Sequence, residues 1–415
     1  MKVFKFGGAS VSSADAVRNS VNILKMYPDN KVLVISAMGK TTNALEIVAR
    51  RYFSGDAEVW AAFEEVKAYH DQIITELWGN PVELPEVKKM FTELGNRIKG
   101  ERSLNFDYEY DQIVAFGELL STQIISLYFN SIGLKNQWVD VRTCLKTDDV
   151  FREANIEWEL SERLAKRVFT FESEDLYITQ GFVGATLTNQ TTTLGREGSD
   201  YTAAILANLL DAEDVSIWKN VPGILNADPD FFAQTQKIGE LSYKEAIELS
   251  YSGAKVIHPK TIKPLQNKNI PLLVKSFVDP LEPGTIIHSL AHRLDLVPVI
   301  IVKKNMALIT LSPNDFSFIS IGNVSDMFGL FARFRLKVGL LQQSAIDLSL
   351  VFDEPEQGID ELISKLQEKF EVKYNTGLDL VTVRYYTPEV VAQLTNGRTV
   401  YVEQKSRRTA RMLMK

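Results

Sequence analysis

The sequence has little cysteine, no long uninterrupted apolar run and no low-complexity segment. Its single cysteine, Cys144, cannot form a disulfide within the chain, which excludes a disulfide-stabilised scaffold. No apolar run approaches the roughly 18–20 residues that a membrane-spanning helix needs, and the N-terminus leads into a predicted strand instead of a secretion signal. We therefore expect a cytoplasmic protein without a membrane partner.

Charge is nearly balanced. The formal net charge is −7 and the pI is near 5.4, which argues against a broad nucleic-acid-binding surface but permits a local basic pocket for phosphate. At 415 residues the chain exceeds the roughly 250–300 residues of a single core, so we expect two or more domains. The apolar share of 45% and the charged share of 24% are ordinary for a globular protein.

Short apolar runs alternate with helical patterns through the first two thirds of the chain, which predicts an α/β fold with a mainly parallel sheet. The segment 55–105 is predicted to be a helical insertion, and the Thr- and Gly-rich segment 181–195 a β-hairpin with Asn189 near its tip. The predicted strands are 2–6, 31–36, 136–141, 176–179, 214–218 and 271–275, and the predicted helices are 13–26, 42–53, 112–129, 200–210 and 241–250.

A different pattern begins near Pro298, after the prolines and glycine of 280–298 interrupt the first one. The order β-α-β-β-α-β is typical of a ferredoxin-like unit, and the remainder looks like a truncated second unit. We therefore predict one domain over 1–285 and a second region over 299–415, divided into 299–375 and 376–415. The predicted elements are strand 300–304 or 306–311, helix 322–335, strands 337–342 and 346–352, helix 357–369, strands 371–374 and 379–385, helix 387–395 and strand 398–403.

The first candidate site segment is Lys5 to Ser10, KFGGAS, in which a strand ends in Gly7 and Gly8 before a helix. Glycines let backbone N–H groups approach an anion, and Lys5 adds a full charge, so the segment has the form of a phosphate cradle. A tight strand-to-helix turn is the structural alternative.

The next strand ends in a second candidate segment, Ser36 to Asn43 (SAMGKTTN). Ligands of open α/β sheets bind beyond the carboxyl ends of strands, so this loop and the glycine loop are predicted to face one crevice. The hydroxyls of Ser36 and Thr42 can bind a carboxylate, although a threonine here also serves as an ordinary helix N-cap.

Glu118 lies within the apolar helical pattern FGELLS. A buried glutamate needs a cation or a ligand ammonium, whereas on an exposed helix face it needs neither; the sequence leaves both open.

The most specific segment is 191–200, TTTLGREGSD, which enters a predicted helix. Arg196 offers a planar fork for a carboxylate, and Ser199 and Asp200 lie where a helix start can bind phosphate or orient a lysine. Helix capping alone explains Ser199 and Asp200 but not the preceding Thr-rich hairpin.

A fifth segment combines WKNVPGILNADP at 218–229 with GAKVIHP at 253–259. A strand that breaks into turns gives a surface for a nucleotide base, and Lys255 is predicted to reach its phosphates. His258, before Pro259, is predicted to be structural.

In their order and spacing, these five segments resemble the amino-acid kinase family and, within it, the aspartate kinases. KFGGAS is similar to the family's KFGGTS, TTTLGREGSD to its TTTLGRGGSD, and GAKVIHP to its GAKVLHP. Residues 299–415 resemble the paired ACT regulatory units of aspartate kinases. The resemblance implies a monofunctional kinase that uses ATP with Mg²⁺, acts on L-aspartate in the first step of aspartate-family amino-acid biosynthesis, binds an amino-acid effector in the ACT region and forms a homodimer.

The resemblance also implies a role for each matching residue. Lys5 and Asp200 would be catalytic. Aspartate would be bound by Ser36, Thr42, Glu118, Phe182 and Arg196, and the nucleotide by Gly7, Gly8, Ser10, Ser199, Trp218, Lys219, Asn220 and Lys255.

Several positions depart from the family pattern. Ala9 replaces a Thr and Glu197 a Gly, while Asn220, Leu225 and Asp230 alter the nucleotide loop. Gly339 and Ala345 stand where lysine-inhibited members carry acids, so we expect little or no sensitivity to lysine.

Two other functions remain open. One is a kinase for another acceptor, namely glutamate, N-acetylglutamate or a nucleotide, although an ammonium-binding Glu118 disfavours an acetylated substrate. The other is a catalytically silent amino-acid sensor, which the altered nucleotide loop favours and the presence of Lys5, Arg196 and Asp200 opposes.

Overall fold

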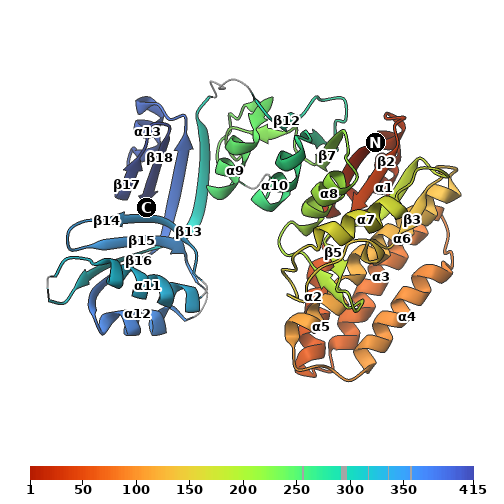
Figure 1. Cartoon of the computed structure of the whole chain (residues 1–415), viewed down its shortest axis with the longest axis horizontal. Helices are drawn as coiled ribbons and strands as arrows, with labels where there is room; N and C mark the ends of the chain where they lie inside the picture. The colour runs from red at the N-terminus through yellow and green to blue at the C-terminus, as the bar shows by residue number, and fades with distance from the viewer. Residues whose placement is uncertain (255–256, 291–296, 316, 335, 356–357) are drawn as a thin grey trace. The chain divides into compact units, whose positions relative to one another are not determined.

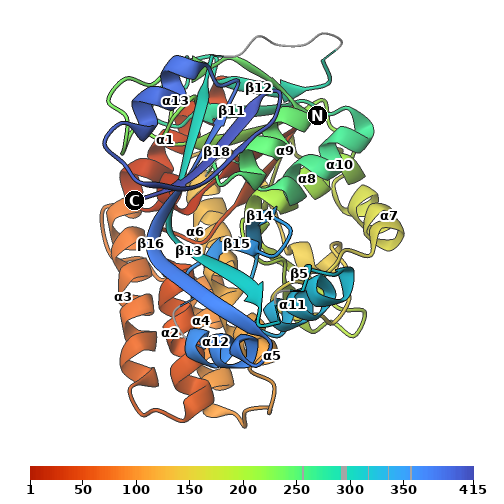
Figure 2. The same ribbon diagram turned by 90° about the vertical axis from the view of Figure 1, so that its left-hand side faces the viewer.

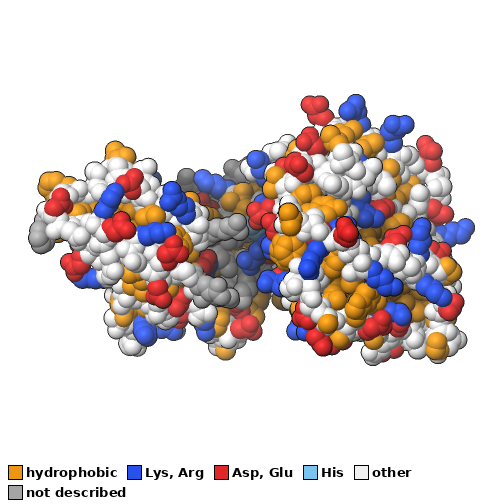
Figure 3. All heavy atoms as spheres, turned by 90° about the horizontal axis from the view of Figure 1, so that it is seen from below, with side chains coloured by type: hydrophobic (Ala, Val, Ile, Leu, Met, Phe, Trp, Pro, Cys, Tyr) orange, Lys and Arg blue, Asp and Glu red, His pale blue; other side chains and the backbone are white. Residues whose placement is uncertain are grey.

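The computed structural model describes the whole chain except residues 255–256, 291–296, 316, 335 and 356–357. It contains two compact units, drawn mainly from red to green and from teal to blue in Figure 1. The first comprises Met1–Ile224, Lys237–Ser250 and Lys255–Arg293, and the second comprises Leu225–Gln236, Tyr251–Ala254 and Leu294–Lys415. Acidic, basic and apolar side chains are interspersed on the face shown in Figure 3.

The second unit therefore includes a segment, 225–236, that lies far earlier in the chain than the predicted boundary at 285–299. Hydrogen bonds fasten this segment to the following region. The carbonyl of Asn226 accepts from the N–H of Ile300 at 2.7 Å, and the Asn226 amide donates to the carbonyl of Pro298 at 3.2 Å. Unit membership follows these long-range bonds and not chain order.

An eight-stranded sheet forms the centre of the first unit, in the order β10-β12-β11-β7-β1-β2-β4-β3. All neighbouring strands are parallel except β11 and β12. The central strands are buried along nearly their whole length, as expected for a parallel sheet covered on both faces. The strands are β1 (Lys2–Phe6), β2 (Lys31–Ile35), β3 (Gln137–Val139), β4 (Leu176–Gln180), β7 (Asp214–Lys219), β10 (Glu240–Ser242), β11 (Leu272–Ser276) and β12 (Thr285–His288).

Helices pack on this sheet, with α8 against β1, β2 and β7 and α6 against β2 and β4. The segment 55–105 is helical, and small two-stranded sheets complete the unit. The helices are α1 (Ala14–Lys25), α2 (Thr41–Ser54), α3 (Val59–Trp78), α4 (Pro85–Lys99), α5 (Phe106–Val114), α6 (Phe116–Ser131), α7 (Trp158–Val168), α8 (Gly198–Leu209), α9 (Tyr243–Tyr251) and α10 (Pro259–Lys268), with short 3₁₀ turns at Gly8–Val11 and Val141–Thr143. The small sheets pair β5 (Val183–Ala185) with β6 (Thr191–Thr193) and β8 (Ile224–Leu225) with β9 (Lys237–Ile238).

The continuous helical stretch Phe106–Ser131 corrects one expectation from the sequence. By length and composition it is able to cross a membrane, because its few charged residues do not lower its mean hydropathy enough to exclude it. Most of it is buried inside the first unit, which a core helix explains without a membrane.

The second unit contains a six-stranded antiparallel sheet in the order β14-β15-β13-β16-β18-β17. Figure 2 shows its two long strands, β13 and β16, side by side, with α11 and α12 near one end and α13 near the other. This sheet with its helices corresponds to ACT-type, ferredoxin-like units. The elements are β13 (Val299–Pro313), α11 (Ile321–Arg333), β14 (Val338–Gln343), β15 (Leu348–Asp353), α12 (Ile359–Gln367), β16 (Phe370–Arg384), α13 (Pro388–Thr395), β17 (Val400–Lys405) and β18 (Thr409–Met414).

The two alternatives predicted for the first strand, 300–304 and 306–311, both lie in one strand of 15 residues, β13, and the two strands predicted at 371–374 and 379–385 form one strand of 15 residues, β16. The polar run Lys303-Lys304-Asn305 interrupts the apolar pattern, but the backbone absorbs it as an irregularity, with shifted register between Lys303 and Met306 and a positive φ of 56° at Asn305. The sequence did not predict β18, whose Ala, Arg and Met residues favour strands only weakly.

Candidate active site

Lys5 reaches the site because of the pleat of β1. Phe4 and Phe6 point into the apolar cluster on one face of the sheet, so Lys5 between them points to the other face, which α8 covers. There its Nζ lies 2.6 Å from Oδ1 of Asp200, in the first turn of α8. Strand and helix thus bring together two residues 195 positions apart.

Asp200 is fully buried between two lysines. Its Oδ2 lies 3.3 Å from Nζ of Lys219, the last residue of β7, which adjoins β1 in the sheet. Burial alone would raise the pKa of Asp200, but the attraction and hydrogen bonds of the two lysines outweigh it and hold the pKa below its ordinary value. Asp200 is therefore ionised at neutral pH, and the group carries one surplus positive charge.

The glycine loop after β1 packs closely against the loop after β2. A Cβ on Gly8 would lie 2.8 Å from the carbonyl oxygens of both Ala37 and Gly39, and the N–H of Gly39 donates to the carbonyl of Gly8 at 3.0 Å. Gly39 itself has a positive φ of 54°. Only glycine fits at position 8, and the two loops share one edge of the sheet as predicted.

Glu118 is buried in the first turn of α6, and its Oε1 accepts the N–H of Ala37 at 3.2 Å. Burial raises its pKa to about 8, although the bond from Ala37 and the charge of Lys5 act in the opposite direction. Among the described residues, none forms a hydrogen bond with Oε2. The ionised form of Glu118 is therefore able to accept a further cationic donor.

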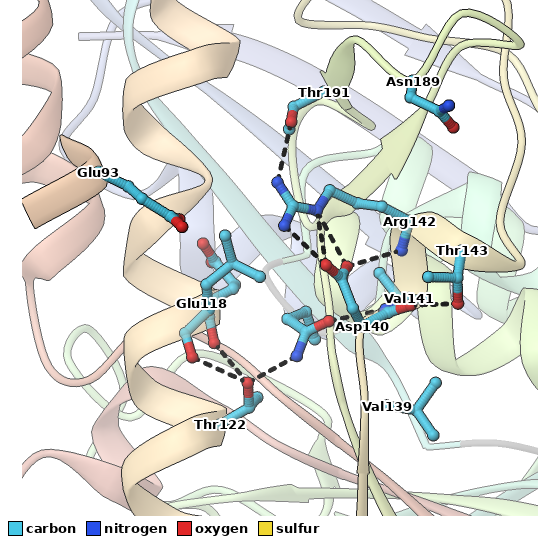
Figure 4. A network of polar contacts seen from close by, with 12 residues as sticks. Glu93, Glu118, Thr122, Val139, Asp140, Val141, Arg142, Thr143, Asn189 and Thr191 are labelled. Carbon is cyan, nitrogen blue, oxygen red and sulfur yellow. Dashed lines mark hydrogen bonds and ion pairs between the residues drawn. The ribbon is translucent and has the colours of Figure 1, made fainter. Parts of the chain in front are cut away.

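A chain of hydrogen bonds supports Glu118 from behind (Figure 4). Thr122, one turn later on α6, donates to the carbonyl of Glu118 at 2.8 Å and accepts from the amide of Gln180 at 2.7 Å. The Gln180 oxygen accepts the N–H of Val141 at 2.8 Å. Gln180 ends β4, so the end of this strand fixes the helix that carries Glu118.

Figure 4 also shows Arg142 between Asp140 and the β5–β6 hairpin. Its guanidinium pairs with Asp140 at 2.7 Å and donates to Oγ1 of Thr191 at 3.1 Å. The sequence did not single out Gln180 or Arg142, because the partners of Gln180 and the Thr191 partner of Arg142 lie about 40 residues away or more. No local pattern signals such contacts.

The segment before α8 is tightly packed and conformationally restricted. A Cβ on Gly181 would lie 2.4 Å from Cβ of Ser199, and Phe182 has a positive φ of 68°. The N–H of Phe182 donates to Oγ1 of Thr202 at 2.9 Å. This packing places Phe182 beside the N-terminus of α8, where unpaired N–H groups favour an anion.

The comparisons with known proteins agree with this geometry. A family model described as the amino acid kinase family matches residues 1–276. The chain belongs to the amino acid kinase family.

Relatives of this amino acid kinase include lysine-sensitive aspartokinase 3 of Escherichia coli (strain K12), which is 32% identical over 85% of the chain and 78% of the relative. Chloroplastic aspartokinase 1 of Arabidopsis thaliana is 31% identical over 88% of the chain and 65% of the relative. Among solved structures, Escherichia coli aspartokinase III with lysine and aspartate (T-state) matches all of the chain and 95% of that structure, with 28% identity and a TM-score of 0.85. The same enzyme with aspartate and ADP (R-state) matches all of the chain and 96% of that structure, with 27% identity and a TM-score of 0.83.

Within this amino acid kinase, the position of Trp218 limits how it is able to contact a nucleotide. The indole of Trp218 is fully buried, packed edge-on against Phe4, Phe6 and Tyr27. Trp218 pairs with Phe6 across parallel strands, so its side chain shares the core-facing side of the sheet. Only its backbone remains available to a nucleotide, whereas Lys219 points to the Asp200 side.

The remaining predicted residues differ in how closely they join the site. The carbonyl of Ser36 accepts from Ser121 at 2.8 Å, beside Glu118, and Thr42 is the second residue of α2. Arg196 and Asn220 are exposed, and no described residue forms an ion pair with Arg196. Lys255 lies outside the described residues, while His258 caps α10 by accepting the N–H of Lys260, as a structural role predicts.

Proposed function

We propose that this chain is an aspartate kinase that transfers the γ-phosphoryl group of ATP to the side-chain carboxylate of L-aspartate. The products are ADP and 4-phospho-L-aspartate, and this reaction is the first step of aspartate-family amino-acid biosynthesis. The observation that carries the proposal is the buried group Lys5–Asp200–Lys219, held at 2.6 and 3.3 Å beside the glycine loop and the start of α8. The solved structures of Escherichia coli aspartokinase III with aspartate, in one case together with ADP, also support it.

This group suits phosphoryl transfer to a carboxylate. A carboxylate is already a nucleophile at neutral pH and needs no general base, so catalysis rests on positioning and on neutralising charge. Lys5 supplies a cation where negative charge develops on the transferred phosphoryl group. Asp200 holds that lysine in place, and Lys219 keeps the buried carboxylate ionised.

The nucleotide phosphates would contact two segments of the site. Gly7, Gly8 and Ser10 follow β1, and Ser199 lies at the start of α8, so backbone N–H groups from both segments suit phosphate oxygens. Among the described residues, no cluster of His, Cys, Asp and Glu side chains is suited to hold a metal ion by itself. Mg²⁺ would therefore be held largely by the ATP phosphates, where it neutralises their charge.

Each charged group of aspartate would be bound by a side chain able to carry the opposite charge, and the ligand ammonium would favour the ionised form of Glu118. Glu118 offers a buried oxygen to the ammonium, and Arg196 offers a bidentate fork to the α-carboxylate. Ser36, Thr42 and Phe182 would complete the pocket. An acetylated amino acid has no ammonium for Glu118, which counts against N-acetylglutamate as the acceptor.

A coupled assay of ADP release, run with and without L-aspartate, tests the proposal. We expect release that depends on aspartate, and hydroxylamine should trap the acyl phosphate. Release with glutamate or a nucleotide instead would reassign the acceptor. No release with any acceptor would favour a catalytically silent amino-acid sensor.

We further propose that residues 299–415 of the second unit are an amino-acid-responsive regulatory region through which a cytoplasmic homodimer forms. Strands β14 and β17 are the two edges of its sheet, and such edges are commonly covered by a partner. Phe318 and Ile321 add exposed apolar surface near α11. Light scattering should give twice the chain mass of 46.8 kDa.

A further inference from the structure

Asp111 is a fully buried carboxylate outside the substrate contacts proposed above. It lies on α5, seven residues before Glu118 on α6. The two helices continue through Ala115, whose N–H donates to the carbonyl of Asp111 at 3.4 Å and whose carbonyl accepts from Leu119 at 3.2 Å. Seven residues are about two helical turns, so both carboxylates lie on one side of the helix, about 10 Å apart along its axis.

Three hydrogen bonds converge on the Asp111 carboxylate. Oδ2 accepts the backbone N–H groups of Thr193 and Arg152, each at 2.9 Å, and Oδ1 accepts the Thr193 hydroxyl at 2.7 Å. These partners lie 82 and 41 residues away in the chain. Asp111 therefore fastens α5 to the end of β6 and to the turn at Arg152.

Both fastened segments control the path of the chain toward Arg196. Thr193 is the last residue of β6 and precedes Arg196 by three positions. The carbonyl of Thr193 accepts from Ala154 at 3.0 Å, and a Cβ on Gly195, where φ is 77°, would lie 3.2 Å from the carbonyl oxygen of Arg152. Arg196 thus leaves the sheet from a point that Asp111 and the Arg152 turn define.

Among the described residues, no lysine, arginine or histidine forms an ion pair with Asp111. The Arg152 guanidinium instead pairs with Asp107 at 3.1 Å and lies 4.5 Å from the ring centroid of Tyr110. Burial raises the pKa of Asp111 to about 6, against the opposing effect of its hydrogen bonds. Asp111 is therefore ionised at neutral pH, which is costly for a buried carboxylate without a salt bridge. An ionised carboxylate accepts stronger hydrogen bonds than a neutral group does, and these bonds hold the two segments.

We propose that Asp111 is a positioning residue for the acceptor site, which holds the strand leading to Arg196 at a fixed distance from the helix that carries Glu118. Arg196 and Glu118 bind the α-carboxylate and the neighbouring α-ammonium of the amino acid in the function proposed above, on which this inference rests. Asp111 sets their spacing without contacting substrate.

Glu109 provides a matched control on the same helix. It is also fully buried, but it forms an ion pair with Arg97 and accepts the N–H of Ser103 at 2.6 Å, so it fastens α5 to other parts of the helical insertion. Residues 109 and 111 point about 160° apart around a helix. Losing either carboxylate removes a comparable buried network, but only Asp111 connects to the Arg196 loop.

The test compares Asp111→Ala with Glu109→Ala in the full chain. Both should lower the melting temperature. Asp111→Ala should also raise the KM for aspartate on the order of tenfold or more, because misplaced binding groups lose much of their effect, and should leave the KM for ATP within about twofold. Glu109→Ala should leave both KM values within about twofold. Equal effects of the two variants on the aspartate KM, or none from Asp111→Ala, would overturn the inference.

Two further measurements keep the inference testable if Asp111→Ala folds poorly or if the parent shows no activity with aspartate. Thr193→Val preserves shape and removes the bond to Oδ1, and it should raise the aspartate KM by about two- to fivefold. Limited trypsin digestion needs no activity. Cleavage after the exposed Arg196 should be faster in Asp111→Ala and Thr193→Val than in Glu109→Ala, and equal rates would contradict the proposed role. An inactive parent whose variants still differ in cleavage would refute only the proposed function.

Discussion

The two units of the molecule treat buried polar groups in opposite ways. In the first unit, the ionisable side chains of Lys5, Asp111, Glu118 and Asp200 are all buried. In the described strands of the second unit, Thr382 is the one buried polar side chain, and the remaining buried side chains are apolar. Burying an ionisable side chain is costly, and such groups cluster at functional sites. The comparison therefore places the catalytic chemistry in the first unit, whereas the strands of the second unit are held together by apolar packing.

The largest effect is expected from removing the Lys5 ammonium in the first unit. Lys5→Ala should lower kcat by about 10³-fold or more, because Lys5 supplies charge where it develops in the transition state. Asp200 keeps Lys219 as a partner, so the protein should remain folded in a circular dichroism melt. Lys2→Ala, on the same strand but paired with Asp29, is the control, and a kcat for Lys5→Ala within tenfold of the parent would remove Lys5 from catalysis.

The next effect concerns substrate affinity. Arg196→Lys should raise the KM for aspartate by about tenfold or more, since an ammonium cannot reproduce a planar bidentate grip. The KM for ATP, measured in the same assay, serves as the internal control and should change little. An unchanged aspartate KM would place Arg196 outside the pocket.

A third prediction uses the pH dependence of stability. The folded protein binds the Glu118 proton more tightly than the unfolded chain does, with a pKa of about 8 against an ordinary value of 4.5. Stability should therefore fall as pH rises between these values, by about 1.4 kcal/mol per pH unit, and Glu118→Gln should lack this loss.

Denaturant unfolding at several pH values measures this difference, with Glu65→Gln at an exposed position on α3 as the matched control. The advantage of Glu118→Gln over the parent should grow up to about pH 8 and then level off. A constant difference across this range would show that Glu118 is already ionised in the folded protein.

The smallest effect is expected in the second unit. Lysine should inhibit by less than about twofold, since an effector changes activity only through its differential affinity for two states. Gly339 and Ala345 offer no carboxylate for its ammonium, and Asp347 is engaged with the Ser312 hydroxyl at 2.5 Å. Inhibition curves with lysine, threonine and methionine decide between effectors, and strong inhibition by lysine would refute this prediction.

Local motifs identified several of the residues that the structure brings together. Lys5, Gly8 and Asp200 belong to segments of ten residues or fewer whose composition alone indicates a phosphate site. The structure brings Lys5 and Asp200 together. The sequence does not show which face of the sheet Trp218 points to, because a strand buried on both faces has no alternating pattern of apolar residues. Asp111 was missed because its partners lie far away in the chain, although it shares with Glu118 the signal of an acid within an apolar helix.

In the fold, as in the site, features with a local sequence pattern were predicted and features that depend on distant partners were not. Periodicity located most helices and six strands of the first sheet, since each of those patterns is local, but it did not locate the short strands β10 and β12. The continuity of β13 through Lys303 and Lys304 depends on its partner strand, because β16 pairs with it on both sides of the irregularity. Pairing of this kind is decided by tertiary structure and has no signature in either segment alone.

The strand order of the second unit has a consequence for its synthesis. β17 precedes β18 in the chain, yet β18 lies between β17 and β16 and is the neighbour with which β17 pairs in the described sheet. On a ribosome, β17 would therefore emerge before β18, the strand that attaches it to the sheet. The backbone of β17 would stay unpaired with the sheet until β18 is synthesised. The long strands β13 and β16 extend through both halves of this sheet, so there is no position at which the two ACT-type halves could be separated and each expected to fold alone.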